Sequence, residues 1–578
     1  MRLLVAGLML VLACPLWGQD SVIVIDPNAP PSDSIVRGGP PPEVVAELIA
    51  FYNDSATTRM QGDVSLPAGS RFEGKLALYR GSLRIAGRVV GPIAVANGTL
   101  YLLPGAAVDG EILVVGGRLL RSEQVDHLGP ERVYWDAAPV IRGADGMLAL
   151  RERRRPLGEI ATARTTFQAG KIRTTLSLAT GGTYNRIEGL PVLFGPLFEF
   201  RPSSRTYARI DLRGILRTAG EDTDLRSDFG YVVRADLRFG GSTEFGIGGR
   251  LYSEVEPIED QPLSAGESGW SAFLLQRDYR DYYERRGVAG MVYIQPARPL
   301  RIEVTLSRDS ERSVRATDPW SLLRNSDRWR RNPLIDDGHY FTTGVQVDYD
   351  SRNDRDRPTT GWMIRSRFEH LTSDDIAPVA LPPVVRPSPT TGGGYHTDRI
   401  SLDVRRYSRL TPGLRVNARV RADGWVAGSR LPVQRRVSLG GPDLLPGFDF
   451  RSFTCAPRGF SDPANPALCD RMIATQVEVR TRLGLNLGYR VPDRESGRRG
   501  RFIGIEEADL VFFSDAGKAW LAGGGPGQVP VNRIPALKEW ALDIGLGLDA
   551  GEIGAYLAKS VSEGGEPVKF VVRLQRRF

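Results

Sequence analysis

An alternation of apolar and polar side chains runs from about residue 157 to the C-terminus, and it restricts the possible folds more than any other feature. A period of two places successive side chains on opposite faces of a β-strand. Residues 301–306, 400–405 and 414–423 each have one apolar face and one polar face. A soluble sheet of so many strands would curl, split or expose its edges, whereas a closed barrel in lipid satisfies every backbone group. The pattern predicts an all-β fold with a transmembrane antiparallel β-barrel over residues 157–578.

The composition agrees with a barrel that has a polar lumen. Mean hydropathy is −0.23 and 41% of the residues are hydrophobic, as expected when only alternate residues of each strand face lipid. We expect about 16 strands of roughly 10 residues, and counts of roughly 12 to 18 remain open. No run of apolar residues is long enough for a transmembrane helix.

The net charge of +8 arises mainly from arginine. A surface that meets anionic lipid head groups explains this charge, and an arginine-rich genome explains it equally well. We expect no binding to nucleic acid, because the N-terminal residues described next predict that the chain is exported.

Residues 1–19 are typical of a secretory signal peptide, because a basic start precedes the apolar run 3–13 and small residues follow it. Cleavage is expected after Gly18 or Gln19. An alternative is a lipoprotein signal that ends at Cys14, which would leave that cysteine lipidated. In an exported chain, Cys455 and Cys469 are expected to form a disulfide that contributes about 3 kcal/mol.

The segment before the barrel divides into three parts. Residues 20–60 are interpreted as a linker and a short helix, and residues 121–156 as a second linker. Within residues 61–120, a short glycine motif recurs at Gly74, Gly91 and Gly110. This spacing indicates coils of a β-solenoid, and a small β-sandwich or meander is the alternative. The segment resembles the right-handed β-helix of bactofilins and is expected to lie in the periplasm.

Several barrel motifs resemble the bacterial surface-antigen barrel of the BamA/TamA superfamily of outer-membrane assembly factors. Residues 349–354 and 358–362 are similar to its strand–turn–strand signature, and residues 437–448 to the loop that folds back into its barrel. Residues 478–480 and 511–517 resemble two of its strands, and Phe578 matches its terminal aromatic residue. POTRA domains, which this superfamily usually carries, are not evident in residues 21–156.

The resemblance implies an in-folded loop that pairs with acidic residues of the barrel wall. The position before the Gly-aromatic pair, usually arginine in the family, is Pro446 here, and Arg451 is the candidate substitute. Its expected partners are Glu478 or Asp515, and the alternative is that Arg451 is a solvated lumen residue. The expected loop residues are Gly440, Gly441, Leu445, Pro446, Gly447, Phe448 and Arg451.

The last strand is expected to act as a C-terminal signal for the barrel assembly machinery, through Phe570, Val572, Leu574 and Phe578. The resemblance implies assembly, insertion or translocation of polypeptide at the outer membrane, with the N-terminal part in the periplasm. Expected partners are outer-membrane lipid, lipopolysaccharide and client polypeptides. The alternatives are a passive channel, a structural barrel linked to periplasmic components, or a lipid-acting enzyme. No catalytic motif, metal site or cofactor site is recognised, so we expect no enzyme.

Overall fold

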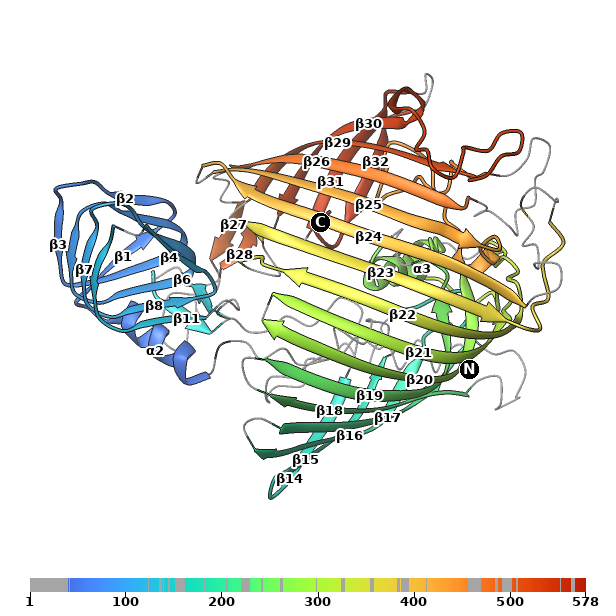
Figure 1. Ribbon diagram of the computed structural model, residues 1–578, viewed down its shortest axis with the longest axis horizontal. Helices are drawn as coiled ribbons and strands as arrows, with labels where there is room; N and C mark the ends of the chain where they lie inside the picture. Colours follow the sequence, from blue (N-terminus) through green and yellow to red (C-terminus); the bar gives the residue numbers. More distant parts are fainter. Residues whose placement is uncertain are drawn as a thin grey trace.

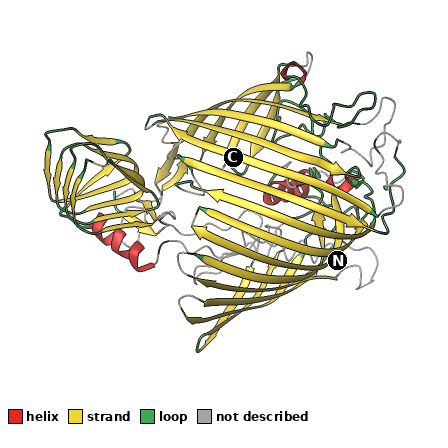
Figure 2. Cartoon of the chain, viewed as in Figure 1, coloured by secondary structure: helices red, strands yellow, loops and turns green. Residues whose placement is uncertain are grey.

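The computed structural model describes residues 40–577 with internal gaps, of which the longest are 151–161, 220–228, 386–393, 456–468 and 491–501. The expected signal peptide, Cys14 and Phe578 therefore lie outside the described residues. Strands make up most of the fold, as Figure 2 shows. A small β-solenoid lies beside one end of a large curved sheet that forms the barrel (Figure 1). No helix in the described part of the chain is long and apolar enough to span a bilayer.

The solenoid is built from two parallel sheets that share successive coils. The larger sheet has the order β1-β4-β6-β8-β11, with β2 beside β4 and β9 beside β6, and the smaller has the order β10-β7-β5-β3. The strands are β1 Thr57–Gln61, β2 Val64–Leu66, β3 Arg71–Glu73, β4 Lys75–Ile85, β5 Arg88–Val90, β6 Ile93–Leu102, β7 Ala107–Asp109, β8 Ile112–Val115, β9 Arg118–Arg121, β10 Asp126–Leu128 and β11 Glu131–Tyr134.

Glycines stack at one corner of the solenoid, as their spacing predicts. A Cβ atom on Gly91 or Gly110 would collide with the backbone of the glycine one coil earlier, so only glycine allows the coils to stack this closely. The same column continues to Gly129. The solenoid therefore extends past residue 120, because β10 and β11 pair with β7 and β8. This corrects the interpretation of residues 121–156 as a linker.

The solenoid has a dry interior and a helix on its outside. Leu76, Leu78, Val95 and Val114 belong to the interior cluster and are buried. Helix α2 (Pro42–Asn53) covers the outer face of the larger sheet with Val45, Leu48 and Tyr52. A hairpin of β12 (Val140–Arg142) and β13 (Leu148–Leu150) completes this second cluster.

Within the described residues, the barrel is one antiparallel sheet of 17 strands in sequence order, from β14 to β32. The hairpin of β27 and β28 forms a separate two-stranded sheet between β26 and β29. The strands are β14 Thr162–Ala169, β15 Ile172–Thr180, β16 Val192–Ser203, β17 Thr206–Leu216, β18 Phe229–Gly240, β19 Glu244–Pro257, β20 Tyr282–Ala297, β21 Leu300–Ser313, β22 Gly338–Asp350, β23 Gly361–Ser373, β24 Tyr395–Arg409, β25 Leu414–Gly428, β26 Arg471–Leu483, β27 Leu487–Arg490, β28 Phe502–Ile505, β29 Ala508–Trp520, β30 Ala541–Ala550, β31 Ile553–Ser560 and β32 Lys569–Arg573.

The two faces of this sheet are inverted relative to a soluble protein. On the outer face, large apolar side chains such as Ile247, Leu306 and Phe512 remain about half exposed. We call this apolar outer surface the apolar belt. Toward the lumen, charged side chains such as Glu303 and Arg480 are almost fully buried. An apolar exterior around a polar interior is the arrangement that a lipid environment requires.

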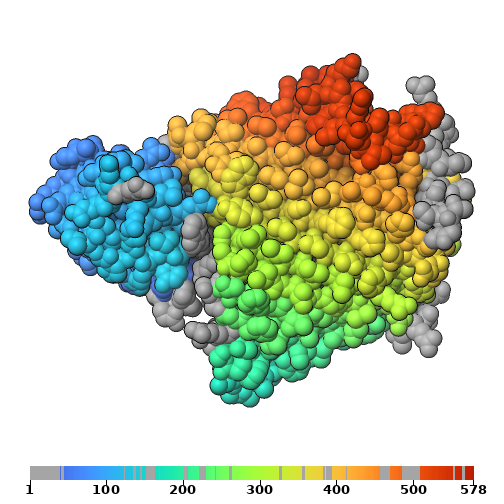
Figure 3. Space-filling model, in the orientation of Figure 1, coloured from blue at the N-terminus to red at the C-terminus, as the bar shows by residue number. Residues whose placement is uncertain are grey.

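The two ends of the barrel differ. Short turns such as 240–244 and 550–553 lie at one end, and long connections such as 258–281 and 429–470 lie at the other. The solenoid lies at the short-turn end of the barrel (Figures 1 and 3). There, Arg118 Nη2 donates to the carbonyl oxygen of Ser351 at 2.8 Å, and Arg409 lies 3.7 Å from Asp63.

Candidate functional site

Described residues of four long connections lie inside the barrel near its long-connection end. These connections are residues 181–191, 258–281, 314–337 and 429–470, and the second contains helix α3 (Ala265–Leu275). Residues from each connection are buried, among them Arg186, Asp281, Asp336 and Gln434. We call the described parts of these four connections the plug.

The connection between β25 and β26 contains the loop that the sequence predicts. Gly441 and Leu445 exchange backbone hydrogen bonds of 3.2 Å and make a tight turn. Phe448 is 3% exposed and packs in a cluster with Leu439, Leu445 and the wall residue Met472. The loop is therefore folded inward and held by apolar packing, with Pro446 buried and Gly440 partly buried beside it.

Arg451 is buried as an ion-paired residue, but its partners differ from the expected ones. Arg451 Nη2 donates to Glu259 Oε2 at 2.8 Å, and Nη1 donates to Asp281. Both acids belong to the connection 258–281 and not to the wall. The backbone of Arg451 is left-handed, with a φ of 56°, and its guanidinium stacks on Phe450. The predicted pairing with Glu478 or Asp515 is therefore wrong.

Asp281 is the point where all four parts of the plug meet. Its carboxylate accepts from Arg186 at 2.6 Å, lies 2.6 Å from Arg330, and also accepts from Arg451. These three arginines come from the connections 181–191, 314–337 and 429–470. Burial alone would raise the pKa of Asp281, but Arg451, Arg330 and Arg186 hold that pKa below its usual range. One ionised carboxylate therefore links four segments that are distant in sequence.

The two expected wall partners are buried with other neighbours. Glu478 accepts from Arg480 and, at 2.8 Å, from Asn417. Asp515 accepts from Arg577 in the C-terminal segment. The in-folded loop instead reaches the wall through the Gly447 amide, which donates to Asp543 Oδ2 at 2.7 Å.

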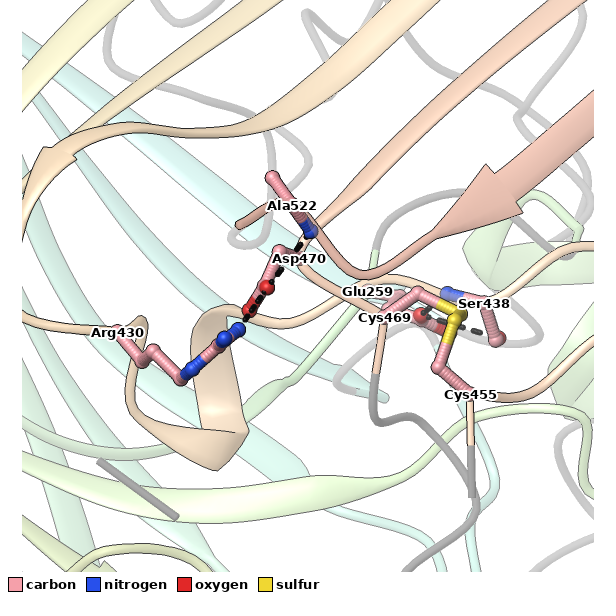
Figure 4. The surroundings of a disulfide bond; sticks show 7 residues. All are labelled: Glu259, Arg430, Ser438, Cys455, Cys469, Asp470 and Ala522. Atoms are coloured by element: carbon pink, nitrogen blue, oxygen red, sulfur yellow. Dashed lines mark hydrogen bonds and ion pairs between the residues drawn. A yellow bond between two sulfur atoms is a disulfide. The ribbon is translucent and has the colours of Figure 1, made fainter. Parts of the chain in front are cut away.

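A disulfide between Cys455 and Cys469 closes the end of the in-folded loop (Figure 4). Cys469 also bridges Val437 through backbone hydrogen bonds, so both ends of the loop are joined beside the cystine. On either side, Ser438 donates to Glu259 at 3.3 Å, and Asp470 accepts from Arg430 and from the Ala522 amide. The disulfide thus reinforces the attachment of the loop to the plug and to the wall.

The C-terminal segment leaves the sheet and enters the lumen. Strand β32 pairs with β31 only from Lys569 to Arg573. Glu267, at the first turn of α3, accepts from Arg573 Nε at 2.9 Å and from the Leu574 amide at 2.8 Å. Arg577 then pairs with Asp515. The end of the chain is therefore bound to the plug, while Phe570 and Val572 remain exposed on the outer face.

The sheet has two edges, and they belong to its first and last strands. We call the outer edges of β14 (162–169) and β32 (569–573) the seam. Within the described residues, no backbone pairing joins these two strands. Because all 17 strands are antiparallel to their neighbours, β14 and β32 run in the same direction. The antiparallel pairing used elsewhere in the barrel is therefore not available to close it between them.

Sequence reasoning missed Glu259, Glu267, Asp281 and Asp543. Asp543 carries a visible signal, since it occupies the lumen face of a regularly alternating strand directly opposite Asp515. Glu267 also carries one, because Ser264 and Glu267 form a capping box. Nothing in the local sequence identifies Glu259 or Asp281 as partners of Arg451, which lies far along the chain.

No protein-family model and no curated protein sequence matches this chain. Among solved structures, this chain is similar to BamA from Haemophilus ducreyi lacking POTRA domains 1–3, with 11% identity and a TM-score of 0.39. The match covers 72% of this chain and 76% of the BamA chain. CdiB from Acinetobacter baumannii is 11% identical, with a TM-score of 0.29 and coverages of 72% and 65%. CdiB from Escherichia coli is 11% identical, with a TM-score of 0.29 and coverages of 71% and 62%. With 11% identity and TM-scores below 0.5, these likenesses carry no conclusion about the function of this chain.

Proposed function

We propose that this chain is an outer-membrane barrel that inserts or translocates polypeptide, and that client strands pair at the seam. The observation that carries the proposal is that no described strand pairs with the outer edge of β14 or of β32, both of which lie within the apolar belt. An unpaired backbone group in lipid costs several kcal/mol, so the seam favours any strand that supplies hydrogen-bond partners. Addition of a strand to a sheet edge is a common way to bind polypeptide.

The plug inside the lumen favours polypeptide handling over passive conduction. A stable pore needs an open path, whereas four connections meet at Asp281 inside this barrel. The contacts of Glu267 hold the end of β32 from within, so the edge of β32 is restrained by the plug as well as by five paired residues. We infer that movement of the plug changes the width of the seam.

The location and partners follow from the same proposal. The signal peptide directs export, the apolar belt lies in the outer membrane among phospholipid and lipopolysaccharide, and the solenoid lies in the periplasm. During biogenesis, the barrel assembly machinery binds the last strand through Phe570 and Val572. Client polypeptides then occupy the seam.

Site-specific photo-crosslinking in cells tests the seam. A photoreactive residue is placed at Phe167 on β14, at Val572 on β32, or at the control position Phe512 on β29, which is paired on both sides. The three side chains are 56%, 52% and 51% exposed, so all three positions have a similar exposure to lipid. We expect adducts with other outer-membrane polypeptides at the two seam positions and only lipid adducts at Phe512. Equal polypeptide adducts at all three positions, or none at the seam, would contradict the proposal.

A structural link between the membrane and periplasmic components is the second candidate. The contacts of Arg118 with Ser351 and of Arg409 with Asp63 favour it, because they fix the solenoid to the barrel. Deletion of residues 42–150 separates the two functions. A link requires the solenoid, whereas seam crosslinks to client polypeptides persist without it.

A further inference from the structure

Three arginines face outward near the long-connection end of the barrel. Arg286 lies on β20, and Arg308 and Arg312 lie on the neighbouring strand β21. All three are exposed, and they alternate with lumen-facing residues such as Arg285 and Asp309. We call Arg286, Arg308 and Arg312 the arginine triad.

The strand register brings the triad together. Arg286 is paired with Ser310, so Arg308 and Arg312 are its two diagonal neighbours on the same face. Diagonal neighbours in an antiparallel pair are about 7–8 Å apart at the backbone, within reach of side chains of this length. Like charges at this spacing repel each other, and an anion bound among them would relieve the repulsion.

The triad has no acidic partner within the described part of the chain. No ion pair or hydrogen bond joins any of the three guanidinium groups to the described residues. Glu284 faces Arg312 across the strands, but it lies 3.6 Å from Arg217. His339, which follows on β22 opposite Ser310, pairs with Asp375. In contrast, the adjacent lumen residue Arg285 binds Asp309 at 2.8 Å and Glu256 at 3.2 Å.

An apolar surface begins directly beside the triad. On the same face, Arg308 is paired with Val288, and Leu306 and Val304 follow along β21 toward the short-turn end. Val288 and Leu306 are 48% and 49% exposed. Acyl chains can therefore contact this apolar surface. An anionic head group attached to them would lie next to the three guanidinium groups of the triad.

We propose that the arginine triad binds the phosphate of a phosphorylated lipid in the outward-facing leaflet, with acyl chains on Val288, Val304 and Leu306. Guanidinium groups bind phosphate through paired charge-assisted hydrogen bonds, and an apolar floor distinguishes a lipid from a free anion. The inference rests on the proposed membrane location, but it does not depend on polypeptide insertion at the seam.

Lipid binding by the purified full chain in detergent tests the triad. The probes are lipopolysaccharide, the same lipid after enzymatic dephosphorylation, and inorganic phosphate. The variant R286Q/R308Q/R312Q is compared with R406Q/K518Q/K559Q, which removes three outward-facing charges that do not form one cluster. We expect the triad variant to bind lipopolysaccharide about tenfold more weakly or worse, and the control variant to bind within about twofold of the parent.

Three other outcomes would contradict lipid binding by the triad. Equal binding by both variants, or undiminished binding of the dephosphorylated lipid, would overturn the proposal. Displacement of the lipid by millimolar inorganic phosphate would assign the triad to a free anion instead. If the triple variant does not fold, the single variant Arg308→Gln gives the same comparison with a smaller loss. Heat-dependent gel mobility reports barrel folding separately, so a chain that forms no membrane barrel is distinguished from one that lacks the lipid site.

Discussion

The solenoid and the barrel use the same alternating pattern with opposite results. In the solenoid, residues such as Leu78 and Val114 point inward and form a dry core. In the barrel, residues such as Leu306 and Phe512 point outward, while Glu303 and Arg480 are buried inside. The difference teaches that alternation fixes the two faces of a strand but not which face is internal. The surrounding solvent decides that, because apolar surface is removed from water in one case and placed in lipid in the other.

The largest expected effect is a charge placed in the dry core. Leu78→Asp buries a carboxylate without a partner and should cost on the order of 5 kcal/mol, enough to unfold the solenoid. Limited proteolysis should then remove residues 42–150, while heat-dependent gel mobility of the barrel persists. Arg84→Asp, at an exposed position of the same strand, is the control. If Leu78→Asp leaves the solenoid resistant to protease, its interior is not dry.

Removal of the central carboxylate of the plug should have the next largest effect. Asp281→Asn leaves Arg186, Arg330 and Arg451 without their shared partner, and breaking a buried pair costs about 3–5 kcal/mol. The temperature at which the folded gel band disappears should fall clearly. Glu303→Gln is the control, since Glu303 is a buried carboxylate that pairs with Arg301, only two residues away on the same strand. Equal losses in both variants would show that Asp281 is not a hub.

A charge on the outer face tests the inversion directly. Leu306→Arg places a cation in the apolar belt and should cost about 2–4 kcal/mol if that face meets lipid. Leu128→Arg, at a 68% exposed position of the solenoid, should change stability by less than about 0.5 kcal/mol because it meets water. Unfolding by urea in lipid vesicles measures both. Similar losses of stability in the two variants would mean that the outer surfaces of the barrel and the solenoid face the same solvent.

The smallest expected effect concerns an exposed ion pair of the solenoid. Arg121 and Glu131 lie 3.0 Å apart with both side chains open to water. Glu131→Gln should cost less than about 1 kcal/mol, because solvent screens such pairs. Chemical denaturation of the full chain checks this value against Asp281→Asn. A loss as large as that of the buried carboxylate would remove the contrast between the two regions.

The sequence predicts strands, the barrel and the solenoid because these depend on local periodicity. The glycine motif also marks the coil that was missed, since Gly129 and Pro130 repeat the pair at Gly91 and Pro92. Strand number was close, with 17 in the sheet against about 16 expected. The disulfide joins the two cysteines that remain once Cys14 is assigned to the expected signal peptide.

The partners of Arg451 could not be predicted in the same way. Acidic residues occur throughout the lumen face, and choosing among them requires the path of four long connections. The left-handed backbone of Arg451 turns its side chain toward Glu259 and Asp281, away from the wall residues that the resemblance implied. Long-range contacts of this kind are set by tertiary structure and leave no local signal.

Depletion of this protein, followed by proteome-wide quantification of outer membranes, tests the central claim most directly. If client strands pair at the seam, other outer-membrane polypeptides should decline together, and the parent chain should restore them. Complementation with the seam variant Thr165→Pro/Val571→Pro should not restore these polypeptides, although the variant still shows the heat-dependent gel mobility of a folded barrel. An unchanged outer-membrane proteome after complete depletion would contradict the account.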